Sequence, residues 1–301
     1  MLRQLDPECC EVSTPAKLNL FLEVSARRPD GYHELETLMV TISLFDTLRF
    51  TRVSAGRLSL RNHWHVSRHH HATPELLPCG SDNLVLKTAN LLLRETGVSR
   101  GVDIDLFKRI PLAAGLAGGS SDAAATLIGL NRLWELGLSL SELRAFGARL
   151  GSDVPFFLAD TNAAICRGRG EIVEPIRLST SLHFVIVKPS GGLSTAQVFQ
   201  NCQPAQFPKS ASDLVRSLHC GHLGLAGTQL FNRLGAPAET LCDQVSQSRD
   251  RFAELPVFGH LMSGSGTSYF GLCHNSLQAR RLAGRLKSTH PGQVFAVQSC
   301  V

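Results

Sequence analysis

A glycine-rich segment at residues 111–124 carries the strongest chemical signal in this chain. It reads Pro-Leu-Ala-Ala-Gly-Leu-Ala-Gly-Gly-Ser-Ser-Asp-Ala-Ala, so a loop that begins with proline runs directly into an alanine-rich helix. The first amides of a helix have no intrahelical acceptor, and the helix dipole favours negative charge at that end. Gly118 and Gly119 lack a Cβ, which lets a phosphate approach the backbone closely. We therefore interpret this segment as a nucleotide phosphate loop, which indicates an enzyme that uses ATP.

Two familiar phosphate loops do not match this segment. It lacks the Gly-x-x-x-x-Gly-Lys-Ser/Thr pattern of Walker-type loops and the Gly-x-Gly-x-x-Gly pattern of dinucleotide-binding loops. An ordinary helix start with a flexible entry loop stays open as an alternative, because serine and glycine are common at that position.

Two other places in the sequence could supply the rest of a phosphoryl transfer. That reaction needs positive charge on the migrating phosphoryl group and a carboxylate near the attacking hydroxyl. Lys17 and Asn19 lie two residues apart on a predicted strand at 16–24, so they share one face, which the alternation marks as polar. Asp153 follows the helix-ending Gly151 in a predicted loop, and an ammonium beside a carboxylate keeps the carboxylate ionised. Spacing alone leaves ordinary roles open, which are a solvated strand lysine and an aspartate that acts as a cap or a turn residue.

The composition favours a soluble globular protein over a nucleic-acid-binding or membrane protein. The 301 residues are 43% hydrophobic, enough for one large core or two ordinary ones. The formal net charge is +5, and the basic residues are scattered, which gives a mild preference for anionic ligands but no nucleic-acid footprint. No apolar run approaches the length of a membrane-spanning helix.

The cysteines and the N-terminus indicate a reducing compartment. The chain has 9 cysteines, an odd number, with no Cys-x-x-Cys pair, so free thiols are the simplest account. The N-terminus lacks a basic stretch followed by an apolar one, so secretion is not expected. We expect a cytoplasmic protein that is a monomer or a weak homodimer.

Hydrophobic periodicity predicts a mixture of strands and helices, and the pattern restarts near residues 178–182. The second half therefore resembles an α+β module. The predicted strands are 16–24, 39–42, 47–50, 102–106, 163–166, 171–176, 182–187, 268–272 and 294–298, and the predicted helices are 84–96, 121–136, 139–151, 211–218, 238–252 and 277–287.

Residues 54–80 read as an irregular loop or a hairpin with a ragged tip. Histidine is a common metal ligand, but the histidines here follow no fixed spacing and have no regular acidic or thiol partner. We favour a solvated insertion over a metal site. The histidines are His63, His65, His69, His70 and His71.

Three segments of the chain resemble the motifs of the GHMP kinases. They are Pro15–Leu20, Pro111–Ala124 and Gly264–Thr267, and the resemblance extends over nearly the whole chain. It implies an α+β fold with the two-domain GHMP kinase architecture. A ribosomal-protein-S5-like α/β domain would occupy residues 1–179, a ferredoxin-like domain residues 180–301, and the active site the cleft between them.

Two further segments, Arg27–Leu35 and Gly151–Phe157, resemble those members of the family that phosphorylate the 2-hydroxyl of CDP-methylerythritol in the non-mevalonate isoprenoid pathway. The resemblance implies that Asp153 is the catalytic base and Lys17 its charge partner. It also implies ATP with Mg²⁺, although the sequence identifies no protein ligand for the ion. The implied ATP-binding residues are Pro111, Leu112, Ala113, Ala114, Gly115, Leu116, Ala117, Gly118, Gly119, Ser120 and Ser121.

The resemblance also implies four substrate-binding residues. Asn19 would help to position the substrate, Tyr32 would stack on the cytosine ring, and His33 would hydrogen-bond to its edge. Phe199 would stack from the other side. The expected partner is this small molecule, with no nucleic acid and no membrane. Two alternatives stay open: a mevalonate- or homoserine-type kinase, which has no use for a cytosine pocket, and a catalytically silent sensor, a type that tends to lose the lysine or the aspartate.

The chain departs from the family pattern at Ala117, where glycine is usual. Alanine costs about 1 kcal/mol of strain if that residue needs a positive φ. Because Gly115, Gly118 and Gly119 remain, we predict that residue 117 does not need one. The insertion at 54–80 is also longer than is usual in the family.

Overall fold

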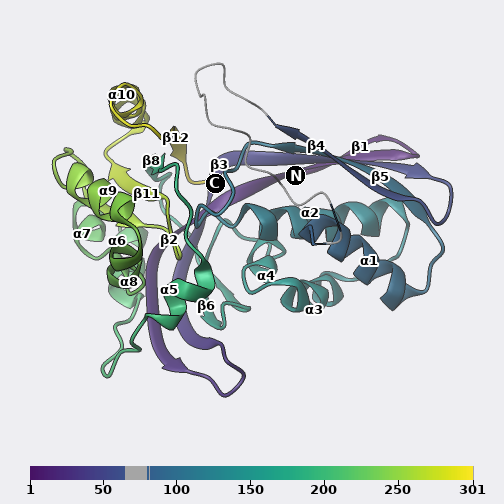
Figure 1. Ribbon diagram of the computed structural model, residues 1–301, viewed down its shortest axis with the longest axis horizontal. Helices are drawn as coiled ribbons and strands as arrows, with labels where there is room; N and C mark the ends of the chain where they lie inside the picture. The colour runs from purple at the N-terminus through teal and green to yellow at the C-terminus, as the bar shows by residue number, and fades with distance from the viewer. Residues whose placement is uncertain (65–79, 81, 301) are drawn as a thin grey trace. The chain divides into compact units, whose positions relative to one another are not determined.

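The computed structural model describes residues 1–64, 80 and 82–300 (Figure 1). The chain forms two compact units, each assembled from separate segments of the sequence. The predicted domain boundary at residues 179 and 180 lies inside the second unit and stays a prediction. Unit 1 consists of Met1–Ala16, Leu44–Leu112 and Ala117–Asp160, and unit 2 of Lys17–Ser43, Ala113–Leu116 and Thr161–Val301.

Unit 1 contains a sheet with the strand order β1-β2-β3-β5-β4. The pairs β1–β2 and β3–β5 are antiparallel, whereas β5 and β4 are parallel. A parallel pair needs a long crossover, and the first helix lies in that connection. β2 and β3 also contribute residues to unit 2. The strands are β1 (Leu2–Asp6), β2 (Cys9–Arg27), β3 (His33–Val53), β4 (Leu58–Trp64) and β5 (Gly101–Lys108).

The helices of unit 1 lie on one side of β1, β4 and β5 (Figure 1). Their apolar faces form a core with the strands, in which Phe50, Ile104, Leu127 and Trp134 are buried. A Cβ at Gly129 would lie 2.4 Å from the Phe50 ring, so glycine lets the second helix approach the sheet closely. The helices are α1 (Leu84–Thr96), α2 (Gly118–Leu133), α3 (Leu140–Leu150) and α4 (Val154–Phe157).

Local capping residues account for both ends of α1 and for the start of α3. The Asn83 side chain accepts from the Val85 amide at the start of α1, and Gly97 ends it in the left-handed region. Ser139 and Glu142 form a reciprocal capping box at the start of α3. The predicted helices at 84–96 and 139–151 are confirmed.

Unit 2 contains an antiparallel sheet with the strand order β10-β11-β8-β12. Two helices share a core with this sheet, in which Val185, Val187, Phe252 and Leu282 are buried. These elements are β8 (His183–Lys188), β10 (Gly259–Met262), β11 (Tyr269–Cys273), β12 (Gln293–Gln298), α9 (Asp243–Ala253) and α10 (Ser276–Lys287).

Short elements complete unit 2 around its parts of β2 and β3. One strand pairs antiparallel with β3, and another pairs parallel with β2. They are β6 (Ala163–Gly168), β7 (Ile172–Pro175), β9 (Phe231–Asn232), α5 (Thr195–Gln200), α6 (Ser212–His219), α7 (Leu223–Thr228) and α8 (Gly235–Leu241).

Several predicted elements need correction. β2 is longer than the predicted strand at 16–24 and is buried on both faces from Lys17 to Val24, not half-buried. Residues 58–64 form a strand that pairs parallel with β5, so they are neither an irregular loop nor part of a hairpin. The predicted helix at 238–252 is two helices, since Cys242 has an extended backbone with φ −152°.

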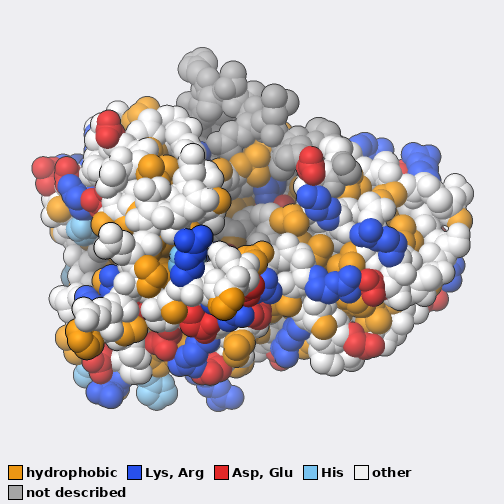
Figure 2. All heavy atoms as spheres, turned by 60° about the horizontal axis from the view of Figure 1, so that its bottom comes forward, with side chains coloured by type: hydrophobic (Ala, Val, Ile, Leu, Met, Phe, Trp, Pro, Cys, Tyr) orange, Lys and Arg blue, Asp and Glu red, His pale blue; other side chains and the backbone are white. Residues whose placement is uncertain are grey.

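The cysteines in the described part of the chain are free thiols, as expected. They number eight, whereas Cys79 lies outside the described residues. Within residues 1–64 and 82–300, no helix combines the length and the hydropathy that crossing a bilayer requires. On the face drawn in Figure 2, acidic and basic side chains are interspersed.

Candidate active site

The predicted phosphate loop ends at the first turn of α2. The first intrahelical hydrogen bond runs from the Ser121 amide to the Ala117 carbonyl, over 3.0 Å. The helix therefore offers no acceptor to the amides of residues 118–120, and the N-cap residue Ala117 supplies no side-chain cap. Such a turn favours an anion for both hydrogen-bonding and dipole reasons.

Ser121 anchors the start of α2 within unit 1. Its buried hydroxyl donates to the Pro15 carbonyl at 2.6 Å and lies 2.6 Å from the Thr14 hydroxyl. This side chain therefore joins α2 to β2.

The backbone at Ala117 contradicts the prediction made for it. Its φ is 55° and its ψ 31°, which places a non-glycine residue in the left-handed region. Ala113 has the same kind of conformation, with φ 46°. The neighbouring glycines do not remove the need for a positive φ, because the chain must turn at residue 117 itself to enter α2.

We expect Ala117→Gly to raise the free energy of unfolding by about 1 kcal/mol, because glycine has no Cβ to clash in the left-handed region. Urea denaturation monitored by circular dichroism measures this change. Ala123→Gly, in the interior of α2, is the control and should lose about 1 kcal/mol. An unchanged midpoint for Ala117→Gly would contradict the assignment of strain to this residue.

In unit 2, the middle of the predicted phosphate loop contacts the residues on either side of the Gly264–Thr267 motif. The Ser268 amide donates to the Ala114 carbonyl over 3.1 Å, and the Ser263 hydroxyl donates to the Gly115 carbonyl over 3.0 Å. A Cβ at Gly115 would lie 2.0 Å from the Ser263 carbonyl oxygen, so only glycine fits there. Two motifs far apart in the sequence are thus held together by hydrogen bonds and close backbone packing.

Lys17 and Asn19 lie together on β2, as their spacing predicts. The Lys17 ammonium donates to Asn19 Oδ1 and, at 2.8 Å, to the Gly115 carbonyl. Asn19 Nδ2 donates to the Thr37 hydroxyl at 2.8 Å. Lys17 is only 3% exposed, so the alternative of a solvated strand lysine is wrong.

Sequence reasoning missed two members of this polar network, Thr37 and Ser263. The backbone amide of Asn19 donates to Ser263 Oγ, and the Thr37 hydroxyl donates to the Phe21 carbonyl. Ser263 directly precedes the third motif, which was a usable signal. Thr37 lies between Glu36 and Leu38 on β3, outside every motif, and carried no local signal.

Asp153 is the N-cap residue of α4 in unit 1 and does not lie in a longer loop. It has a helical backbone conformation, and its side chain makes no capping hydrogen bond. Asp153 therefore lies in a turn, as one of the ordinary roles allows, but its side chain does not cap α4. Lys17 belongs to unit 2, so its action together with Asp153 stays a prediction.

The four predicted substrate residues all belong to unit 2. The rings of His33 and Phe199 lie 5.2 Å apart, tilted by 31°. Tyr32 is 51% exposed, and the Arg169 guanidinium lies 4.6 Å from the centre of its ring. The sequence did not identify Arg169 as a neighbour of the Tyr32 ring. Burial lowers the pKa of His33 below its ordinary value, and nearby Arg27 lowers it further, which favours the neutral imidazole.

The histidine-rich segment is only partly described. His63 Nε2 lies 2.8 Å from Asp105 Oδ1, and the His63 ring stacks on Phe107. His65, His69, His70 and His71 lie outside the described residues. The described histidines, cysteines and acidic residues include no group of three that could hold a metal ion.

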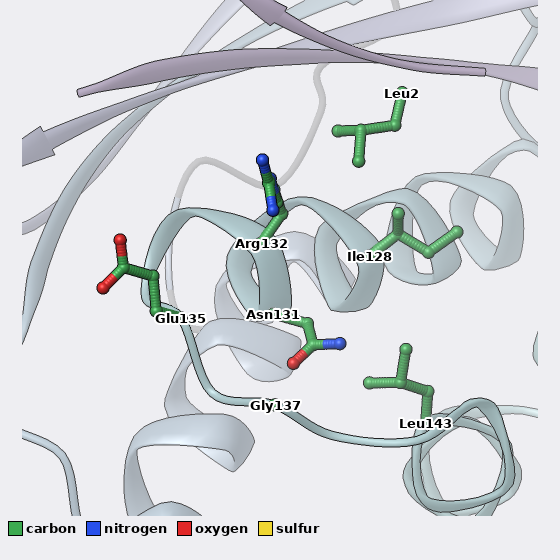
Figure 3. A pocket seen from close by; sticks show the side chains of 7 residues that line it. All are labelled: Leu2, Ile128, Asn131, Arg132, Glu135, Gly137 and Leu143. Atoms are coloured by element: carbon green, nitrogen blue, oxygen red, sulfur yellow. The ribbon is translucent and has the colours of Figure 1, made fainter. Parts of the chain in front are cut away.

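A pocket of about 450 Å³ in unit 1 contains none of the predicted site residues (Figure 3). It is lined by the end of α2, the following turn, α3 and β1. Its lining residues are Leu2, Ile128, Asn131, Arg132, Glu135, Gly137 and Leu143.

Comparison with known proteins shows the family to which this chain belongs. The model of the GHMP kinase N-terminal domain matches residues 83–161, and that of the GHMP kinase C-terminal domain matches residues 212–292. The chain belongs to the GHMP kinases.

One curated relative in this family is the 4-diphosphocytidyl-2-C-methyl-D-erythritol kinase of Pelotomaculum thermopropionicum, which is 40% identical over 91% of this chain and 92% of its own length. The crystal structure of a 4-(cytidine 5'-diphospho)-2C-methyl-D-erythritol kinase is similar with a TM-score of 0.79 and 36% identity, over 97% of this chain and 100% of that one. A mevalonate kinase from L. major has a TM-score of 0.76 at 18% identity, covering 99% and 98% of the two chains, and this likeness shows the fold alone.

Proposed function

We propose that this chain is an ATP-dependent kinase that phosphorylates the 2-hydroxyl of 4-diphosphocytidyl-2-C-methyl-D-erythritol, a step of the non-mevalonate isoprenoid pathway. The observation that carries the proposal is the 40% identity with a relative of that name over 91% of the chain. The pair Tyr32 and His33 supports it, because a ring that stacks and an imidazole that hydrogen-bonds suit a cytosine.

In the proposed reaction, Asp153 accepts the proton of the substrate hydroxyl. The hydroxyl oxygen forms a bond to the γ-phosphorus of ATP while the bond from that phosphorus to the leaving ADP oxygen breaks. Lys17 supplies positive charge for the phosphoryl group, and its hydrogen bonds to Asn19 and Gly115 hold its ammonium in place. Asn19 helps to position the substrate.

ATP would bind through residues 111–121, with its phosphates at the first turn of α2. The amides of Gly118, Gly119 and Ser120, which have no acceptor in the helix, would donate to phosphate oxygens. Mg²⁺ would accompany the nucleotide and neutralise part of its charge, and it commonly keeps several water ligands beside phosphate oxygens. We assign no protein ligand to the ion.

The cytosine would bind in unit 2. Tyr32 would stack on the base, and a neutral His33, favoured by its lowered pKa, offers one donor and one acceptor to the pyrimidine edge. Phe199, whose ring packs near that of His33, would close the other side. We further propose that the protein is cytoplasmic, acts as a monomer or a weak homodimer, and binds neither nucleic acid nor a membrane.

An ATP-turnover assay with three alcohols tests the proposed function. CDP-methylerythritol, mevalonate and homoserine are offered separately with ATP and Mg²⁺. We expect turnover with CDP-methylerythritol only. Turnover with either of the others would reassign the substrate, and ATP binding without any transfer would identify a catalytically silent protein.

Tyr32→Ala should raise the KM for the cytidine substrate by about tenfold, because stacking on one base contributes about 1–3 kcal/mol. The KM for ATP should not change. Tyr32→Phe keeps the stacking face and is the matched control, expected to bind the substrate almost normally. Steady-state kinetics in both substrates measure the effect. Equal KM values for the alanine and phenylalanine variants would remove Tyr32 from the base-binding site.

A further inference from the structure

Three charged side chains are buried together in unit 1, beside the start of α2. The Lys108 and Asp46 side chains are 0% exposed, and the Asp122 side chain is 4% exposed. The Lys108 ammonium donates to both carboxylates, and its distance to Asp122 Oδ2 is 2.7 Å. We call these three residues the buried triad.

The buried triad connects the two ends of the predicted phosphate loop. Asp46 Oδ1 accepts from the amides of Arg109 and Ile110, at 2.6 and 2.9 Å, directly before the loop begins. Asp122 lies on α2, directly after the loop ends. Because Lys108 bridges the two carboxylates, one chain of buried hydrogen bonds joins the residues that enter the loop to those that leave it.

Lys108 also packs against the first residue of α2. A Cβ at Gly118 would lie 2.9 Å from the Lys108 ammonium nitrogen and 2.9 Å from Ile110 Cγ2. The position of the ammonium group therefore limits where the backbone of Gly118 can lie. The amide of that residue is one of those that the helix leaves without an acceptor.

A buried ionic cluster is an expensive way to hold a fold together. Removing ions from water costs several kcal/mol for each ion, and well-packed apolar residues often stabilise a core equally well. What an ionic cluster provides and apolar packing does not is a fixed hydrogen-bonded geometry. Here that geometry belongs to the two ends of one loop.

We propose that Asp46, Lys108 and Asp122 are positioning residues for the nucleotide. They hold the first turn of α2 in the arrangement that binds the ATP phosphates, and they thereby set the affinity for ATP. This inference rests on the proposed function, because it takes residues 111–121 as the ATP loop.

The test compares two substitutions at Asp122. Asp122→Ala removes the acceptor for Lys108 and should raise the KM and the Kd for ATP by about tenfold or more, with kcat and the KM for CDP-methylerythritol nearly unchanged. Asp122→Asn keeps an acceptor oxygen of the same reach and should restore ATP affinity to near the wild-type value. An ATP affinity of Asp122→Ala within about twofold of wild type would overturn the proposal.

Glu23→Ala is the control for a general loss of stability. Glu23 is a carboxylate in unit 2 with a side chain only 1% exposed, and it is paired with Arg233. Its loss should lower the melting temperature without a change in ATP affinity. An equal loss of ATP affinity in this variant would show that destabilisation alone explains the result.

A second variant covers the case in which Asp122→Ala does not fold. The triple substitution Asp46→Asn, Lys108→Met and Asp122→Leu removes all three buried charges together, an exchange that cores often tolerate. The side-chain oxygen at position 46 can still accept from the amides of Arg109 and Ile110. We expect it to fold and to bind ATP about tenfold more weakly or worse than wild type. Normal ATP affinity in the triple variant would overturn the positioning role.

Wild-type measurements separate this inference from the proposed function. ATP binding without phosphoryl transfer to CDP-methylerythritol would refute the proposed function, and the comparison at Asp122 would still decide the role of the triad. Transfer with equal ATP affinity in wild type and Asp122→Ala would refute the positioning role alone. A wild-type protein that binds no ATP would refute both.

Discussion

Asp153→Asn should lower kcat by at least about 10²-fold, because the amide cannot accept the proton of the substrate hydroxyl. The Kd for ATP should stay close to the wild-type value, since the proposed phosphate contacts lie at residues 111–121. Single-turnover kinetics with ATP and CDP-methylerythritol measure the chemical step, and equilibrium dialysis measures nucleotide binding.

Asp160→Asn is the control for Asp153→Asn. Asp160 is an exposed aspartate in the same unit, seven residues further along the chain. The Asp160→Asn variant should retain normal turnover. Near-normal turnover of Asp153→Asn would exclude Asp153 as the base, and the motif that contains it would then need another role.

Lys108→Met should lower the free energy of unfolding by about 3–5 kcal/mol, because it leaves the buried carboxylates of Asp46 and Asp122 without their shared counter-charge. Urea denaturation of the protein without ligands measures this loss. Lys87→Met is the matched control, since the Lys87 ion pair with Asp82 is exposed, and it should change stability by no more than about 0.5 kcal/mol. A loss of the same small size for Lys108→Met would contradict the triad's structural role.

The loss of unfolding free energy caused by Lys108→Met should grow as the pH rises. Burial raises the pKa of Asp122 to about 7 even with Lys108 present. Between the ordinary carboxyl pKa and this raised value, the folded protein therefore holds a proton there that the unfolded chain has released. A carboxyl with a raised pKa in the folded state makes stability fall with increasing pH. Without the lysine that pKa rises further, so the variant should lose more stability at pH 8 than at pH 5. A pH-independent difference from wild type would contradict this reasoning.

Local signals predicted much of the fold, because they act over a few residues. Asn83 and Gly97 delimit α1, Ser139 with Glu142 starts α3, and both helices lie where the sequence predicts them. The two-residue spacing of Lys17 and Asn19 correctly placed their side chains on one face of β2. The resemblance to the GHMP kinases is confirmed by the family models and by relatives that cover nearly the whole chain.

Long-range packing explains where the sequence was not sufficient. The alternation in β2 predicted a polar face and left a solvated lysine open. Lys17, Asn19 and Glu23 are instead buried, and each has polar partners from distant segments. Residues 58–64 became a strand only because β5 offers them an edge. Ala117 takes a positive φ because of the path that the chain follows into α2.

The sequence by itself determined the motifs, the helix caps and the family, since each of these is a property of residues close together in the chain. Only the tertiary structure decided which polar side chains are buried and which residues share a hydrogen-bond network. Asp46, Lys108 and Asp122 illustrate the difference, because they are far apart in the sequence and form one buried triad in the folded protein. A buried charge is stable only with its partner, and folding brings that partner into place.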